Sequence, residues 1–163
     1  MMEALAKAAA PGEQHAQLAT WEGRWKLVVK HWMDPDMPPG ESEAVSTFKM
    51  LMDGRYLLEN VDGTTPMGPF QGMGITAFDN ISQQFVNLWM DSMGTGVMIS
   101  HAPAGDGAAI QYRGEYNNPM TGGPSKVRSE MLYVGADERT FTMWEDRDGS
   151  EVKTMEISYK REG

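Results

Sequence analysis

The stretch Phe70–Gly96, FQGMGITAFDNISQQFVNLWMDSMGTG, decides the fold that the sequence predicts. It indicates two strands, Phe70–Asp79 and Gln84–Asp91, joined by a short turn and followed by a glycine-spaced corner. Gly72 and Gly74 stand two residues apart and therefore share one face of the first strand. This spacing suits a sharply bent strand or a close approach to the backbone. Corners of this kind close small antiparallel barrels.

Short segments in which apolar and polar residues alternate recur along the rest of the chain. In the first of them, Trp21, Trp25 and Leu27 alternate with charged residues, so the tryptophans are expected on the buried face. The expected strands number about ten: Trp21–Trp32, Glu43–Leu51, Tyr56–Thr65, Phe70–Asp79, Gln84–Asp91, Val97–His101, Ala109–Tyr116, Lys126–Val134, Thr140–Glu145 and Val152–Lys160. Their connections are too short for helices, and closure hides sheet edges. The sequence therefore predicts an all-β, antiparallel up-and-down β-barrel.

The length of 163 residues favours a single domain over residues 1–163. Residues 1–11 are expected to form a flexible tail, and Gly12–Ala19 a short helical turn with His15 on its exposed face. No apolar run is long enough to span a bilayer, so no membrane partner is expected. No secretory signal is visible, which favours a cytoplasmic location.

Cysteine is absent from the chain, which excludes disulfides, thiolate nucleophiles and cysteine metal sites. The 14 basic and 23 acidic residues give a formal net charge of −9. Because binding to phosphate backbones depends on clustered cationic side chains, nucleic acid is not an expected partner.

Six segments, in this order, resemble those of a bacterial domain-of-unknown-function family, DUF1579. They are TWEGRW (Thr20–Trp25), MDPDMPPGESE (Met33–Glu43), GMGITAFDN (Gly72–Asn80), WMDSMGTG (Trp89–Gly96), GEYNNPMTG (Gly114–Gly122) and KTMEISYKR (Lys153–Arg161). The resemblance covers nearly the whole chain and implies a lipocalin-like or calycin-like barrel. It implies no settled activity.

Several side chains are candidates for contact with a ligand inside such a barrel. They are Trp25, Trp89, Asp91, Met93, Tyr112, Arg128, Glu130, Met143 and Glu145. The strand Gln84–Asp91 mixes aromatic and polar groups on one face, as binding cavities do. The hypothesis is that Asp91, Arg128 and Glu145 meet near one cavity and orient a ligand against Trp89. A charge-paired structural network without a guest explains the same residues.

The histidines His15, His31 and His101 are too few and too scattered to predict a metal site, which needs three or four converging ligands. No cofactor is expected, because no cofactor motif is found. Haem binding would need a histidine in the mouth or interior of the barrel, and His31 and His101 are the only candidates for that role.

Methionine is unusually frequent, at 15 of 163 residues, and its flexible side chain suits an adaptable apolar cavity, an imperfectly packed core or a subunit interface. Some strands are apolar on both faces. Val86, Leu88 and Met90 lie on the face opposite Phe85 and Trp89. Because a monomeric barrel needs only one dry face, a homodimer or larger assembly is expected, with the homodimer favoured.

Two functions of different classes remain open. The first is binding of a small, largely apolar molecule in the barrel interior. The second is an enzyme that uses carboxylates such as Asp91 or Glu145 as general acid or base. A structural or oligomeric protein without a ligand is a third reading. The first is favoured, because it needs no nucleophile, metal or cofactor motif, and none is found.

Overall fold

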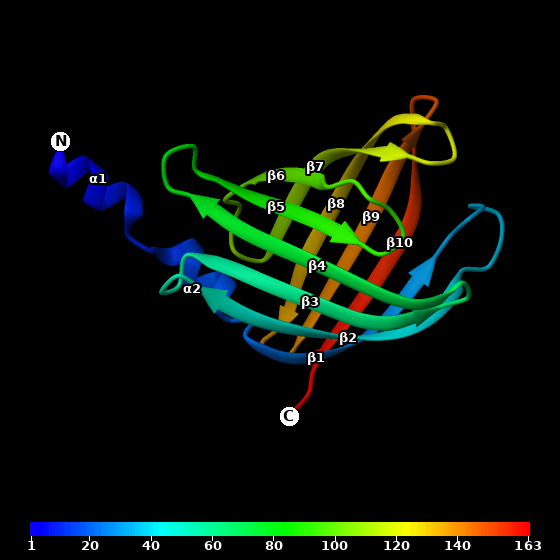
Figure 1. The fold of residues 1–163 in the computed structure, drawn as a ribbon, viewed down its shortest axis with the longest axis horizontal. Coiled ribbons are helices and arrows are strands. Elements are labelled where there is room, and N and C mark those ends of the chain that lie inside the picture. Colours follow the sequence, from blue (N-terminus) through cyan, green and yellow to red (C-terminus); the bar gives the residue numbers. More distant parts are fainter.

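The computed structural model describes residues 1–163, which form two helices and ten strands (Figure 1). The helices are α1 (Met2–Ala9) and α2 (Glu13–Ala19). The strands are β1 (Gly23–His31), β2 (Gly40–Leu51), β3 (Tyr56–Thr65), β4 (Gly68–Asp79), β5 (Gln84–Asp91), β6 (Met98–Pro103), β7 (Ala109–Asn118), β8 (Gly123–Gly135), β9 (Glu138–Arg147) and β10 (Ser150–Arg161). All ten expected strands are present, with ends that differ by a few residues.

The strands form one closed antiparallel barrel in which each strand pairs with its neighbours in the chain. Closure is made by β1 and β10, where Trp25 lies opposite Arg161 and His31 lies opposite Met155. The predicted up-and-down barrel is therefore confirmed. Because every strand is paired on both sides, the barrel has no open edge strand. No helix has both the length and the apolar character that a membrane crossing requires.

The two glycines of β4 allow the close approach that their spacing predicts. Gly74 lies opposite Trp89 of β5, and the indole of Trp89 covers both glycines. A Cβ atom at Gly72 would stand 2.5 Å from Trp89 Cη2, and one at Gly74 would stand 3.2 Å from Trp89 Cε3. The absence of side chains at these positions leaves room for the large ring inside the barrel.

An aromatic cluster fills the end of the barrel next to α2. Trp21, Trp25 and Tyr159 are buried, as the alternation in β1 predicts for the tryptophans. The ring centroids of Trp21 and Trp25 are 5.0 Å apart, and those of Trp21 and Phe48 are 4.8 Å apart. Leu18 of α2 packs into the same core, so α2 covers this end of the barrel. The interior at this end is filled by side chains.

The prediction that His15 is exposed is wrong, because α2 turns the face that carries His15 and Leu18 toward the barrel. His15 is buried, its Nδ1 accepts a hydrogen bond from the backbone N–H of Gly12 at 3.0 Å, and its ring packs nearly perpendicular to that of Phe78. Residues three apart on a helix share one face, so the burial of Leu18 also buries His15.

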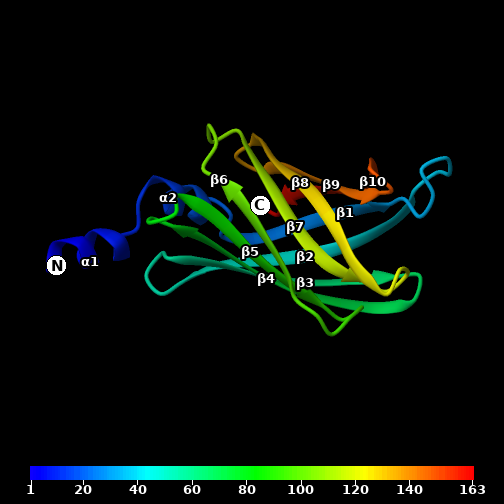
Figure 2. The same ribbon diagram turned by 90° about the horizontal axis from the view of Figure 1, so that it is seen from above.

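Residues 2–9, expected to belong to a flexible tail, form α1, which extends away from the barrel (Figures 1 and 2). None of its residues is buried. Its C-terminal end is held by Asn80, whose Nδ2 donates to the carbonyl oxygens of Ala8 and Ala10 at 3.0 and 2.8 Å. Burial of apolar surface therefore contributes little to its attachment.

Candidate ligand-binding site

The interior of the barrel away from α2 differs from the aromatic cluster, and we call it the lumen. It is lined by side chains that include Glu59, Trp89, Asp91, Met143 and Glu145. Some apolar side chains face inward and pack against the core yet remain partly exposed: Val29, Phe70, Trp89, Met131, Phe141 and Ile157. Eight strands make a barrel whose interior side chains can just fill it, and the diameter grows with strand number. In this ten-stranded barrel, these inward-facing side chains are not fully covered by their neighbours.

Trp89 and Asp91 form one hydrogen-bonded unit at the end of β5. The indole Nε1 of Trp89 donates to Asp91 Oδ2 at 2.8 Å, and the backbone N–H of Met93 donates to Asp91 Oδ1 at 2.9 Å. The backbone of Gly72 and Gly74 supports the indole from below. Because its N–H is already bonded, Trp89 offers a ligand its apolar ring surface rather than a donor.

Glu145 belongs to a separate buried network between β7, β8 and β9. It is 6% exposed and accepts hydrogen bonds from Asn118 Nδ2 at 2.8 Å and from the Tyr116 hydroxyl at 3.3 Å. Asn118 Nδ2 also lies 3.2 Å from Ser125 Oγ. Burial, and then the negative charge of Glu145, raise the pKa of Tyr116 to about 12. These bonds hold the Glu145 carboxylate in place in the wall of the barrel.

Glu59 of β3 is a lumen residue that the sequence analysis missed. Its neighbours on the same face, Leu57 and Val61, are buried, and its Oε1 accepts hydrogen bonds from Ser46 Oγ at 2.7 Å and the Tyr159 hydroxyl at 3.5 Å. Burial raises the pKa of Glu59 to about 7, and these two hydrogen bonds partly oppose that rise. The signal for it in the sequence was a carboxylate between two apolar residues at a period of two.

The second carboxylate oxygen of Glu59 is free. Oε2 makes no hydrogen bond within the protein, and no buried side-chain oxygen or nitrogen lacks a partner, so Oε2 must be accessible from the lumen. It lies 3.5 Å from the point where a Cβ of Gly74 would stand, and Trp89 Cε3 lies 3.2 Å from the same point. Glu59 Oε2, a hydrogen-bond acceptor, and the aromatic ring of Trp89 therefore both lie beside Gly74.

The structure does not bring Arg128 and Glu130 to Asp91 and Glu145. Val127 and Ser129 are buried, so the alternation in β8 turns Arg128 and Glu130 to the outer face. Arg128 bonds both oxygens of Glu151 at 2.8–3.0 Å and stacks 3.9 Å from the ring centroid of Trp144. Glu130 accepts a hydrogen bond from Gln111 at 3.0 Å.

The other predicted site residues occupy three kinds of position. Trp25 and Tyr112 are buried, and Trp25 Nε1 donates to the carbonyl oxygen of Trp21 at 2.7 Å. Met93 lies in the loop after β5 and is 49% exposed. Met143 is partly exposed and shares the inward face of β9 with Glu145. Trp89, Asp91, Met143 and Glu145 therefore line the lumen, whereas Trp25 and Tyr112 are part of the packed interior.

The methionines do not concentrate inside the barrel. Nine of the 15 are exposed: Met1, Met2, Met33, Met37, Met52, Met67, Met73, Met93 and Met120. Met50 and Met131 pack against the core. Of the three readings of their abundance, a cavity lined mainly by methionine does not fit the structure, because most methionines fall in loops, turns and the N-terminal residues.

The histidines lie apart from one another. His31 ends β1 at the rim of the barrel, and desolvation lowers its pKa. His101 lies on the outer face of β6, between the buried residues Ser100 and Ala102. No three histidine, aspartate or glutamate side chains come together in a geometry that could hold a metal ion.

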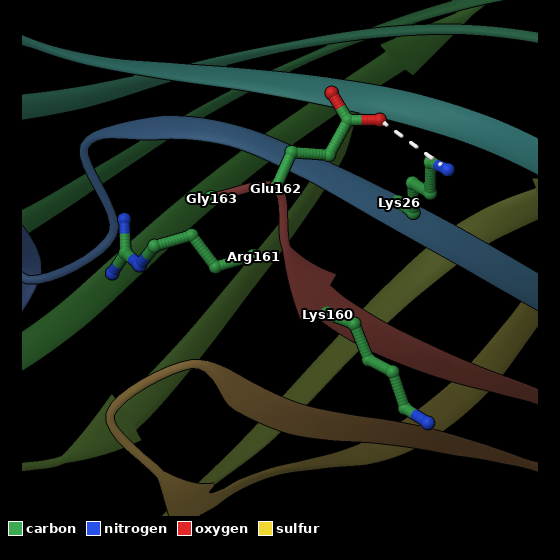
Figure 3. Close-up of a pocket in the computed structure, with 5 residues that line it drawn as sticks. All are labelled: Lys26, Lys160, Arg161, Glu162 and Gly163. Carbon is green, nitrogen blue, oxygen red and sulfur yellow. Dashed lines mark ion pairs between the residues drawn. The ribbon is translucent and has the colours of Figure 1, made fainter.

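Two hollows on the outer wall of β1 and β10 are lined by charged side chains. One, of about 410 Å³, is formed by Lys26, Lys160, Arg161, Glu162 and Gly163 (Figure 3). Within it Lys26 Nζ lies 3.9 Å from a carboxylate oxygen of Glu162. The second, of about 360 Å³, has Val28 as its one hydrophobic residue. Neither has the apolar walls of a site for an apolar ligand.

Comparison with known proteins gives a family and a fold. The family model described as "Protein of unknown function (DUF1579)" matches residues 10–161. Rv2717c from M. tuberculosis superposes with a TM-score of 0.66 at 12% identity, over 94% of this chain and 100% of that one. The S-type phycobiliprotein lyase CPES from Guillardia theta gives a TM-score of 0.64 at 9% identity, over 93% and 94%. Identities this low indicate a shared fold alone. No curated protein matches the chain.

Proposed function

The chain belongs to the DUF1579 family of proteins of unknown function, and we propose that it binds a small, largely apolar molecule in the lumen. One observation carries this proposal: apolar side chains that face inward remain partly exposed around a few fixed polar groups. Binding sites for small molecules combine such apolar walls with a small number of well-placed polar contacts.

The unit of Trp89 and Asp91 supports this proposal. Its two hydrogen bonds and the glycines beneath it fix the indole before a ligand arrives. A site that is already ordered loses less conformational entropy on binding.

Fluorescence titration with the neutral apolar dye N-phenyl-1-naphthylamine tests the proposal. We expect saturable binding of one dye per barrel, and a two- to tenfold weaker affinity in Trp89→Phe, on the order of one lost aromatic contact. Trp144→Phe is the matched control, because Trp144 lies on the outer face against Arg128. No saturable binding, or equal loss in both variants, would contradict the proposal. Native mass spectrometry of gently purified protein then reports a retained natural ligand.

We also propose that the protein is a homodimer formed through the outer wall of β3 to β6. Four apolar side chains lie directly opposite one another across these strands: Leu58, Ile75, Leu88 and Ile99. They face outward, because Leu57, Gly74 and Ser100 on the alternate face are buried. A continuous apolar row on an outer wall is typical of a surface that another subunit covers.

A further inference from the structure

We infer that the ligand is a small apolar amine whose ammonium group binds between Glu59 Oε2 and the indole of Trp89. This inference rests on the proposed function and names the class of molecule that the lumen selects. It starts from the unequal use of the two Glu59 oxygens. Both donors within the protein, Ser46 and Tyr159, go to Oε1, while Oε2 is accessible without a partner. Oε2 is therefore an accessible acceptor to which no group of the protein donates.

Trp89 provides the second proposed contact to the ammonium group. Trp89 Cε3 and Glu59 Oε2 both lie close to the point where a Cβ of Gly74 would stand, at 3.2 and 3.5 Å. A cation beside an indole face is stabilised by the ring quadrupole, and the effect is larger away from water. Asp91 already accepts the indole N–H. The pair thus offers a carboxylate and a π surface, which together suit an ammonium group better than an anion.

Charge in and around the lumen favours a cation as well. Asp91 and Glu145 add two more carboxylates to its wall, and the only arginine near Glu145 is Arg147, at 4.0 Å and 41% exposed. Arg139 is committed at the other end of the barrel, to Thr20 and to the carbonyl oxygens of Gly135 and Ala136. No cation of the protein pairs with Glu59, although carboxylates at such depth are usually paired.

The groups that face Glu59 predict how amine binding depends on pH. They are Ser46 of β2, Gly74 of β4, Trp89 of β5 and Tyr159 of β10, and among them only Tyr159 titrates. The pKa of Tyr159 is raised well above its usual value by burial and by Glu59, so it stays neutral. Glu59, with a pKa of about 7, is about one-tenth ionised at pH 6 and nine-tenths ionised at pH 8. Amine affinity should rise about tenfold between these pH values.

Calorimetric titration with three ligands of similar shape tests the inference: 1-naphthylmethylamine, the neutral 1-naphthalenemethanol and the anionic 1-naphthoate. At pH 8 we expect the amine to bind on the order of tenfold more tightly than the alcohol, and the anion to bind most weakly. The preference for the amine should disappear in Glu59→Gln and persist in Glu130→Gln, a carboxylate on the outer face. Glutamine can still accept the bonds from Ser46 and Tyr159, and a thermal melt verifies that the variant is folded.

The outcomes separate this inference from the proposed function. If the alcohol binds as tightly as the amine, or if Glu59→Gln keeps the preference, the amine inference is overturned while binding in the lumen stands. If none of the three ligands binds and N-phenyl-1-naphthylamine does not bind either, both proposals fail together. An amine affinity that is unchanged between pH 6 and pH 8 also overturns the role of Glu59.

Discussion

At the scale of single residues, burial disfavours the charged form of Glu59, and this makes the stability of the barrel depend on pH. Burial raises its pKa in the folded protein to about 7, from an ordinary value of 4.5. Between these values the folded state binds more protons than the unfolded state, so the free energy of unfolding falls as the pH rises. The loss is complete above pH 7 and amounts to at most about 3 kcal/mol.

Glu59→Gln removes this pH-dependent loss. We expect the variant to match the wild type near pH 4.5 and to exceed it by about 1–3 kcal/mol at pH 8, because the amide never has to ionise inside the barrel. Urea unfolding at both pH values measures the difference, with Glu130→Gln as the outer-face control. A difference of the same size at both pH values would show that Glu59 does not titrate in this range.

At the scale of elements, the hairpin of β4 and β5 depends on the absence of side chains at two positions. A Cβ at Gly72 would stand 2.5–2.6 Å from the far edge of the Trp89 ring, and the bond to Asp91 holds that ring in place. We expect Gly72→Ala to lower the free energy of unfolding by about 1–3 kcal/mol through overpacking, and to change the near-ultraviolet circular dichroism of Trp89.

Gly94→Ala is the matched control for that prediction, because a Cβ at Gly94 meets nothing within 4 Å. Urea unfolding of both variants measures the stability change. Equal stability of the two variants would mean that the indole can shift at no cost, and the close approach would then not hold Trp89 in place.

The elements were predictable from sequence because their signals are local. Alternation along β1 and turn residues such as Asp148 and Gly149 mark each hairpin within a few positions, and both residues of that turn have positive φ angles. Local sequence did not show which face of a strand points into the barrel. Val127 and Arg128 are consecutive and lie on opposite faces of β8. Arg128 was a candidate for the interior, but the closed barrel buries Val127 and turns Arg128 outward.

The candidate site could be predicted from sequence only where the residues that form it are close together in one strand. Trp89 and Asp91 were candidates because one face of Gln84–Asp91 mixes aromatic and polar groups, a pattern that lies within a single strand. Glu59 was missed because its neighbours Leu57 and Leu58 are both apolar and hide the period of two. Its bonds to Ser46 and Tyr159 join residues 13 and 100 positions away, which no local pattern reports.

At the scale of the whole molecule, the barrel has an apolar surface on each side of the same wall. Inside, Leu57 and Trp89 face the core and the lumen, while Leu58 and Leu88 of the same strands face outward. Burial of the inner surface explains why the strands form a closed barrel. In that barrel the strands pair with one another, and this pairing does not depend on the outer surface. The outer apolar row therefore requires an explanation other than the fold itself, and a second copy of the chain is the one that symmetry makes most common.

Leu88→Lys tests that explanation without disturbing the core, because residue 88 points outward and lies next to Ile75 and Ile99 in the row. We expect the wild type to have the mass of two chains in size-exclusion chromatography with light scattering at tens of micromolar, and the variant that of one chain, because a dimer buries roughly 800 Å² per partner there and excludes an unpaired charge. Thr142→Lys, on the outer face of β9, should leave the mass unchanged. A wild-type mass of one chain would refute the dimer, whereas a two-chain mass that survives Leu88→Lys would place the interface on another wall.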